Sequence, residues 1–437
     1  MPAVRPAPER LVHARDLLEF IDASPTPWHA VATTEAILHR HGFARLDEAE
    51  RWQLAVGSRY YVVRGGSSIA AFVLGSGRPE DTGLRLVGAH TDSPGLRLKP
   101  KPALGGDGLL RLAVEVYGGP ILATFADRDL GLAGRIFVRA AVGAEARLVR
   151  IDEPLLRLPN LPIHMNREVN DQGLKFNRQT ELPLILTTLS DEKEAEAWLR
   201  SRLADLAAAD EADILSWELA AYDVHKGSFW GAEGEFIASG RLDNLASCHA
   251  AIRALVATGD TAATAIVTLF DHEEVGSGSA AGAGGTFAAD IVDRLCHHSR
   301  LDAEDRRRTL ARSFLISADM AHAYQPSFPG AYEPGHKVMV NQGPVIKTHA
   351  SQRYATNAET AARFMGLCAA AGVPCQQYAH RGDLSCGSTI GPIVAASLGI
   401  ASVDVGSAMW AMHSARESAG AYDQAYMISA LGAAFAS

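Results

Sequence analysis

The sequence predicts an α/β fold in which a mostly parallel sheet is covered by helices and interrupted by a β-rich inserted domain. Apolar, β-branched runs alternate with helical patterns in the N-terminal and C-terminal parts of the chain. The stretch between Pro94 and Trp230 instead shows short alternating segments, with no long helical pattern before Asp191. The 437 residues also exceed the about 250 to 300 that one hydrophobic core usually serves. Two structural parts are therefore expected.

The N-terminal part begins with helices and continues with strands. Apolar residues keep helical spacing over residues 8–41, apart from one proline-rich interruption, which predicts two helices. Two alternating runs over residues 59–74 flank a Gly-Gly pair, which is typical of a β-hairpin. The apolar residues Leu84, Leu86 and Val87 predict a strand that ends at polar residues.

The C-terminal part repeats strand and helix signals in turn. Strands are expected at residues 263–270, 314–318, 375–379 and 400–405, with a helix at 357–371 among them. We therefore expect a main domain formed by residues 1–94 and 231–437, with residues 95–230 inserted as a β-rich domain. Ligands of such sheets gather at the carboxyl ends of the strands.

Composition and charge exclude several classes of protein. Hydrophobic residues make up 47% and charged residues 21% of the chain, which is typical of a globular protein. A net charge of -9 argues against a nucleic-acid surface. No apolar run approaches the about 18 residues that cross a bilayer, and the N-terminus lacks the apolar stretch of a signal peptide. The five scattered cysteines, none in a CxxC pair, favour reduced thiols and a cytoplasmic location.

The strand predicted at residues 263–270 is followed by acidic residues within 271–276, and this segment gives the strongest single indication of chemistry. Glu273 and Glu274 are adjacent, so on a turning backbone their side chains point in different directions. Glu274 could then bind a metal ion while Glu273 holds a proton of a neighbouring water. Taken alone, the pair could equally be a solvated acidic turn. Potential metal ligands elsewhere in the chain are needed to choose between a metal site and an acidic turn.

Four other places in the chain offer candidate partners. His90 and Asp92 share a side of an extended backbone, so Asp92 can orient the imidazole, although a lone histidine is more often structural. Asp243 precedes a helical run and could instead be a helix N-cap. Asp319 closes one apolar strand, and His413 follows another. The convergence of these strand ends carries more weight than any single residue.

The candidate ligands are too numerous for one tetrahedral zinc ion. They suit two divalent ions that share a carboxylate, about 3.5 to 4 Å apart. Because no cysteine is required, zinc, cobalt and manganese are all chemically acceptable. Such a pair binds a hydroxide and polarises a carbonyl, and Glu273 is placed to carry the proton. The candidate ligands are His90, Asp243, Glu274, Asp319 and His413.

Six segments together resemble the aspartyl aminopeptidases of peptidase family M18. The resemblance extends from about Phe20 to Glu417. The segments are residues 89–94 (AHTDSP), 239–245 (SGRLDNL), 271–277 (DHEEVGS), 352–356 (QRYAT), 386–392 (CGSTIGP) and 411–414 (AMHS). The resemblance implies a zinc-exopeptidase-like catalytic domain, with the inserted β-rich domain serving dimerisation.

The resemblance also implies a role for each candidate ligand. Asp243 would bridge the two ions, and the other ligands would form two pairs, His90 with Asp319 and Glu274 with His413. Glu273 would be the general base, and Asp92 would support His90. The implied reaction is release of an unblocked N-terminal Asp or Glu from a peptide by metal-bound hydroxide.

Three further residues match substrate-contacting residues of the family. Lys347 would pair with the acidic side chain of the substrate, although by itself it would be read as a surface lysine. His322 would contact the substrate as well. His164, which is otherwise a structural histidine, would reach the active site of a neighbouring subunit in a tetrahedral dodecamer and steady the tetrahedral intermediate.

Two departures from the family pattern affect the expected substrate pocket. Residues 325–328 (QPSF) stand where a His-Pro-Asn-Tyr sequence is common, and Ser351 replaces an asparagine. Three alternatives therefore stay open. The chain could be an aminopeptidase of neutral specificity, a deacylase on the same scaffold, or a non-catalytic assembly or cargo-receptor protein. A glycine-rich run to Gly285 lacks GxGxxG spacing and does not indicate nucleotide binding.

Overall fold

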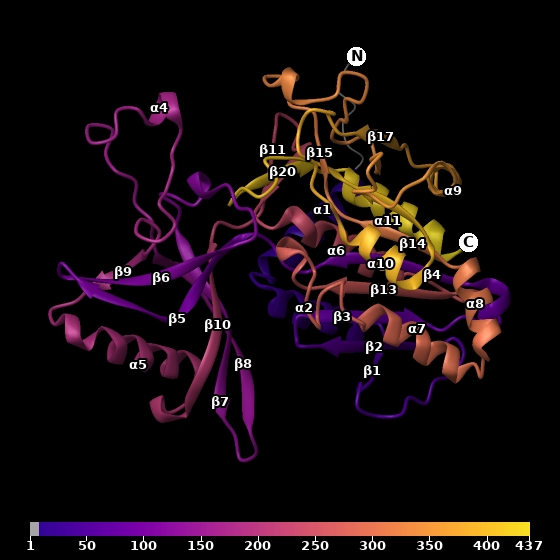
Figure 1. Ribbon diagram of the computed structural model, residues 1–437, viewed down its shortest axis with the longest axis horizontal. Coiled ribbons are helices and arrows are strands. Elements are labelled where there is room, and N and C mark those ends of the chain that lie inside the picture. Colours follow the sequence, from indigo (N-terminus) through magenta and orange to yellow (C-terminus); the bar gives the residue numbers. More distant parts are fainter. Residues whose placement is uncertain (1–7) are drawn as a thin grey trace. The chain divides into compact units, whose positions relative to one another are not determined.

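The computed structural model describes residues 8–437 and divides into two compact units (Figure 1). Unit 1 contains the chain up to Asp92, residues 227–412 and residues 417–437. Unit 2 contains residues 93–226 and the short segment 413–416. Every helix in the described part of the chain is too short or too polar to cross a bilayer.

Unit 1 is built on a nine-stranded mixed sheet, in agreement with the predicted α/β class. Its centre is parallel, since β13 pairs with β4, β4 with β14, and β14 with β18. Antiparallel pairs join this centre to β3 and β16. In spatial order the strands are β1 (Ala44–Arg45), β2 (Arg59–Arg64), β3 (Ser68–Val73), β13 (Thr264–Phe270), β4 (Leu84–His90), β14 (Phe314–Ala318), β18 (Ala401–Gly406), β16 (Val345–Thr348) and β17 (Gln376–Ala379).

Helices cover both faces of this sheet, which explains why its central strands are apolar throughout. One face packs against α1 (Pro8–Asp22), α2 (Pro27–Arg40), α6 (Leu242–Val256), α9 (Ala358–Ala370) and α11 (Asp423–Phe435). The other face packs against α7 (Phe287–His298), α8 (Ala303–Arg312) and α10 (Ile390–Leu398) (Figure 1). In β4, for example, Val87 faces the first group of helices and Leu86 the second. A short helix, α3 (Pro79–Thr82), precedes β4.

Unit 1 also holds a small five-stranded sheet, and unit 2 has a six-stranded sheet of its own. The small sheet consists of β11 (Ser228–Trp230), β12 (Phe236–Ser239), β20 (Glu417–Gly420), β19 (Ala408–Trp410) and β15 (Ala321–His322). The sheet of unit 2 consists of β8 (Ala144–Leu156), β7 (Leu130–Arg139), β10 (Ile214–Asp223), β5 (Gly95–Gly106), β6 (Leu109–Tyr117) and β9 (Leu184–Thr188), with helices α4 (Val169–Gln172) and α5 (Ala195–Ala207).

The parallel centre of the main sheet places several strand ends along one edge. There β4 ends at His90, and the chain leaves β13 and β14 just before Asp271 and Asp319. Gly406 at the end of β18 permits a close approach, because a Cβ there would lie 1.7 Å from the Asp319 carbonyl oxygen. Strand β16 runs antiparallel to β18, so its first residues reach the same edge.

Candidate metal centre

Three of the predicted ligands meet in unit 1. The Nε2 atom of His90 lies 3.4 Å from Asp243 Oδ1 and 3.5 Å from Asp319 Oδ1. All three residues are buried, and their ligand atoms lie within 4.8 Å of one another. These separations are long for hydrogen bonds, but they match ligands held about 2.1 Å from one tetrahedral zinc ion, which stand about 3.4 Å apart. The donor set therefore fits a divalent ion.

The charge of this cluster also calls for a cation. Burial by itself lowers the pKa of His90, but the carboxylates of Asp243, Asp319 and Asp92 outweigh it and raise the pKa well above its usual value. The buried acids thus favour a positive charge at this place. A bound divalent cation would supply that charge and compensate the acids.

A second group of potential ligands in unit 1 combines His90 with Glu273 and Glu274. The chain turns sharply after β13 because His272 adopts a left-handed conformation with φ of 63°, and both glutamates follow this turn. Asp92 holds the turn, since its two carboxylate oxygens accept hydrogen bonds from the backbone N–H groups of Glu273 and Glu274, each at 3.1 Å. His90 Nδ1 lies 3.0 Å from the Asp92 carbonyl oxygen and 3.3 Å from Oδ1.

The carboxylate of Glu273 is close to the ligand cluster and has a raised pKa. Its Oε2 lies 4.0 Å from His90 Nε2, beside the ligand cluster. Burial raises the pKa of Glu273 to about 7; His90 opposes the rise, and the carboxylates of Asp319 and Asp243 add to it. A carboxylate whose pKa lies near the working pH can both take up and release a proton.

Asp243 lies at the kinked start of α6. Asp243 and Asn244 have non-helical φ/ψ there, and the N-cap position belongs to Arg241, whose side chain makes no capping hydrogen bond. The Asp243 N–H donates to Glu417 Oε2 at 3.2 Å, and Asn244 Nδ2 donates to the Ala318 carbonyl at 2.9 Å. Sequence reasoning missed both contacts. The one sequence signal for the contact between Asp243 and Glu417 was that Glu417 lies three residues after the 411–414 segment.

His413 lies in the turn between β19 and β20, in the short segment grouped with unit 2. Its Nδ1 lies 3.1 Å from the carbonyl oxygen of Gly119, also in unit 2. Donation from Nδ1 to that carbonyl fixes the tautomer in which Nε2 carries the lone pair. Metal ligation by His413 would therefore use Nε2.

Lys347 is buried, unlike the surface lysine that its sequence alone would suggest. Its side chain extends from β16, and Nζ donates to the carbonyl oxygens of Asp319 and Met320 at 3.0 and 3.1 Å. The ammonium lies 3.7 Å from Asp319 Oδ2 and 5.2 Å from the centre of the Tyr354 ring. A buried cation is thus held beside the carboxylate cluster.

His322 and His164 have very different surroundings. Burial lowers the pKa of His322 to about 4, and the charge of Lys347 adds to the effect, so its imidazole is neutral at pH 7. His164 lies in unit 2, in an exposed turn between Ile163 and Met165, whose side chains are 47% and 73% exposed. Within unit 2 this turn presents apolar side chains to its surface.

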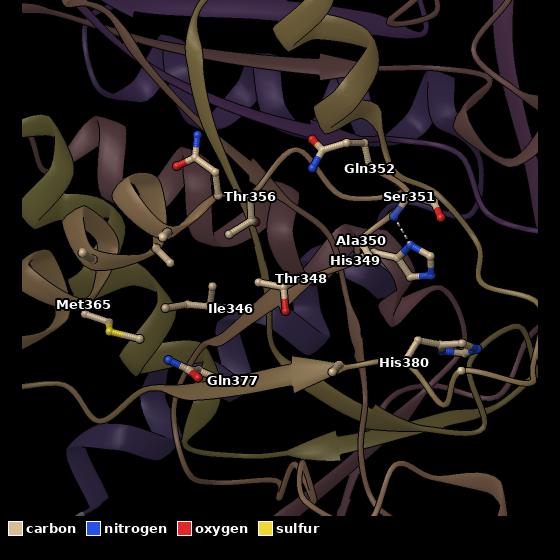
Figure 2. A pocket seen from close by; sticks show the side chains of 16 residues that line it. Ile346, Thr348, His349, Ala350, Ser351, Gln352, Thr356, Met365, Gln377 and His380 are labelled. Carbon is tan, nitrogen blue, oxygen red and sulfur yellow. Dashed lines mark hydrogen bonds between the residues drawn. The ribbon is translucent and has the colours of Figure 1, made fainter.

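A groove of about 900 Å³ lies elsewhere in unit 1 (Figure 2). Ile346 and Thr348 of β16 line it together with Met365 of α9 and the segment around Thr356. Lys347 does not line the groove, because successive strand residues point to opposite faces. None of the lining residues is a candidate metal ligand, so the groove is distinct from the cluster.

Comparisons with known proteins agree on one family. The family model described as "Aminopeptidase I zinc metalloprotease (M18)" matches residues 20–435. A relative from Pseudomonas syringae pv. tomato, named "Probable M18 family aminopeptidase 2", is 46% identical over 425 residues, covering 97% of this chain and 98% of the relative. The cryo-EM structure of the Ape4 and Nbr1 complex matches with a TM-score of 0.94 and 36% identity, over 98% of this chain and 86% of that chain. The S. cerevisiae mApe1 dodecamer matches with a TM-score of 0.82 and 28% identity, over 96% and 95% of the chains.

Proposed function

The chain belongs to the M18 family of zinc metallo-aminopeptidases, and on that premise we propose that it releases unblocked N-terminal Asp or Glu from peptides. One observation carries this specificity: a fully buried lysine stands beside the ligand cluster. Lys347 is 2% exposed and lies 3.7 Å from Asp319, a candidate ligand. An acidic substrate side chain can reach such a cation only at the site itself, where the pair would be desolvated and strong.

The ligand set that we propose holds two divalent ions. Asp243 bridges them, His90 and Asp319 complete one site, and Glu274 and His413 complete the other. The contacts of His90 with Asp243 and Asp319 support the first site, and the tautomer of His413 supports its assignment to the second. When bound, the ions acidify a water molecule and polarise the scissile carbonyl. Zinc is the ion expected, and cobalt or manganese would suit the same oxygen and nitrogen donors.

Glu273 is the proposed general base. Its carboxylate takes a proton from the attacking water and then delivers it to the leaving amine. Its position beside the ligands and its raised pKa support this role. Asp92 contributes by positioning, because it fixes the backbone of Glu273 and Glu274.

His322 is proposed to contact the substrate as a neutral imidazole next to Lys347. Its lowered pKa supports this protonation state. The unusual residues 325–328 and Ser351 lie in the surrounding segments of the sequence. These residues could change the preference between Asp and Glu without affecting the metal chemistry.

Self-association is proposed to complete the active site. The mApe1 structure that matches this chain is a dodecamer, which supports a tetrahedral dodecamer here as well. His164 would enter the active site of a neighbouring subunit, and the exposed apolar side chains around it support contact with another protein surface. The free cysteines support a reducing, cytoplasmic location.

The proposal is tested by a release assay over peptides that differ only in their N-terminal residue. Hydrolysis should favour Asp and Glu, disappear after chelation and return with added zinc. Preference for neutral residues would replace the proposal with a neutral aminopeptidase, cleavage of N-acylated substrates alone would indicate a deacylase, and an inert metal-loaded protein would indicate an assembly or cargo-receptor role.

Individual roles need variants whose metal content is measured. Glu273→Gln should keep both ions and lose turnover, whereas Glu274→Gln should lose metal. Mixed oligomers of inactive Glu273→Gln and inactive His164→Ala subunits should recover part of the activity if subunits share sites. Full activity of Glu273→Gln would remove its role as base, and verified mixed oligomers without activity would remove the role of His164.

A further inference from the structure

Asp404 is a buried carboxylate that the proposed reaction does not use. It lies in β18 with 0% exposure, and burial raises its pKa while the charge of Lys347 opposes the rise. Its oxygens accept two short hydrogen bonds, from Thr389 Oγ1 and from the Ala355 N–H, both at 2.6 Å. A buried carboxylate is costly unless such donors satisfy it, so these contacts are strongly constrained.

The first contact anchors α10. Thr389 is the N-cap of this helix, and its hydroxyl accepts from the Gly391 N–H at 3.2 Å while donating to Asp404. A Cβ at Gly391 would lie 2.3 Å from Asp404 Oδ2, so the carboxylate occupies the space that any side chain there would need. The contact of Asp404 with the start of α10 therefore stabilises the fold.

The second contact anchors the segment that carries Tyr354. Two hydrogen bonds join this segment to Asp404: the Ala355 N–H donates to Oδ2, and the Asp404 N–H donates to Thr356 Oγ1 at 2.9 Å. The segment has two sides. Thr356 lines the groove of Figure 2, whereas the Tyr354 ring lies 5.2 Å from Lys347 Nζ. Asp404 thus fixes the segment that places the Tyr354 ring beside Lys347.

Tyr354 in turn limits where the Lys347 ammonium can be. The ring attracts the cation through its π face, and the carbonyls of Asp319 and Met320 accept two of its three N–H donors. A shift of the Tyr354–Thr356 segment would move the ring away from Lys347 and admit water beside the ammonium. The ion pair between Lys347 and a substrate carboxylate would then be weaker. The position of this ring therefore affects acidic substrates more than neutral ones.

We propose that Asp404 is a positioning residue for substrate selectivity, acting through the Tyr354–Thr356 segment on Lys347. The inference rests on the proposed function, because it acts on the lysine that is proposed to pair with an acidic substrate side chain. Asp404→Ala removes both acceptor oxygens, so the Ala355 N–H loses its partner; Asn would not serve, because its amide oxygen can still accept from Ala355 while its NH2 group donates to the Thr389 hydroxyl. Thr356→Val keeps the charge of Asp404 and removes only the second attachment of the segment.

The test compares kcat and KM for acidic and neutral N-terminal substrates with the metal-loaded full chain. For Asp404→Ala, the acidic-to-neutral ratio of kcat/KM should fall by about tenfold, mainly through a higher KM for the acidic substrate. Thr356→Val should shift the ratio in the same direction by a few-fold. The matched control is Thr389→Val, which removes the other hydrogen bond to the same carboxylate and should lower Tm without changing the ratio.

Two results would overturn the inference. One is an unchanged ratio in Thr356→Val together with an unchanged ratio in folded Asp404→Ala, or in Thr356→Val alone if Asp404→Ala does not fold. The other is an equal change in Thr389→Val. The ranking of substrates by the unaltered protein tests the proposed function separately: a neutral ranking would refute acidic specificity itself, whereas an acidic ranking with unchanged ratios in the variants would refute only the role of Asp404.

Discussion

Replacement of Lys347 by methionine is the most direct test of the proposed specificity. Lys347 is 2% exposed; methionine keeps most of the length and volume of its side chain and removes the ammonium, which donates to two carbonyls. An exposed ion pair would contribute at most about 1 kcal/mol. Loss of one partner of a desolvated, hydrogen-bonded pair costs about 2 to 4 kcal/mol, which corresponds to about a 30- to 1,000-fold loss.

The assay measures kcat/KM for matched peptides that begin with Asp, Glu, Ala or Leu. The full loss is expected for Asp and Glu, and changes of about threefold or less for Ala and Leu. The two carbonyls left without a donor should also lower the free energy of unfolding by about 1 to 3 kcal/mol, which thermal unfolding would detect. Lys337→Met is the control, because Lys337 is exposed and its Nζ lies over the Tyr324 ring. Equal losses for acidic and neutral peptides would refute the assignment of Lys347 to the substrate side chain.

Three further predictions follow from the same contacts. Asp92→Asn should keep the metal ions but lower kcat by about 10- to 100-fold, because an amide cannot accept from both glutamate N–H groups; unchanged kcat with full metal content would argue against this role. Gly406→Ala should lower the free energy of unfolding by about 3 kcal/mol or more, since its Cβ would overlap the Asp319 carbonyl; a Tm equal to that of the unaltered protein would contradict this. Burial raises the pKa of Asp423 from 3.8 to about 7, so the unfolded chain binds fewer protons in this interval and the contribution of Asp423 to stability falls as pH rises through it. In Asp423→Asn the free energy of unfolding should lack this fall with pH. Denaturation of both proteins across the same pH interval would measure the difference.

Much of the fold was predictable because its signals are local. The apolar runs ending at His90, Phe270 and Ala318 are strands in the structure, and the gap in the helical pattern before Pro27 separates α1 from α2. The resemblance to family M18 is confirmed by the match over residues 20–435. Such signals need only the spacing of side chains along the chain, and a single sequence contains that spacing in full.

The candidate site was predictable in its residue types and only partly in its geometry. Strand ends with His, Asp and Glu indicated a metal centre, and the structure brings His90, Asp243 and Asp319 together. At the start of α6 the N-cap position belongs to Arg241, and Asp243 has non-helical φ/ψ two residues later. Glu417 and Asp404 were missed, since a carboxylate that accepts backbone N–H groups has no spacing rule in the sequence.

The sequence by itself determined the class of fold and the family, and it supplied the candidate residues for the proposed chemistry. Only the tertiary structure decided which acid accepts from which donor, how deeply Lys347 is buried and which aromatic ring lies beside its ammonium. The physical reason is the distance along the chain between partners: Asp92 meets the N–H of Glu273, 181 residues away, and Lys347 meets the Asp319 carbonyl across 28. Such pairs form only after the strand order has been chosen, and that order depends on how all the apolar faces pack at once rather than on any one segment.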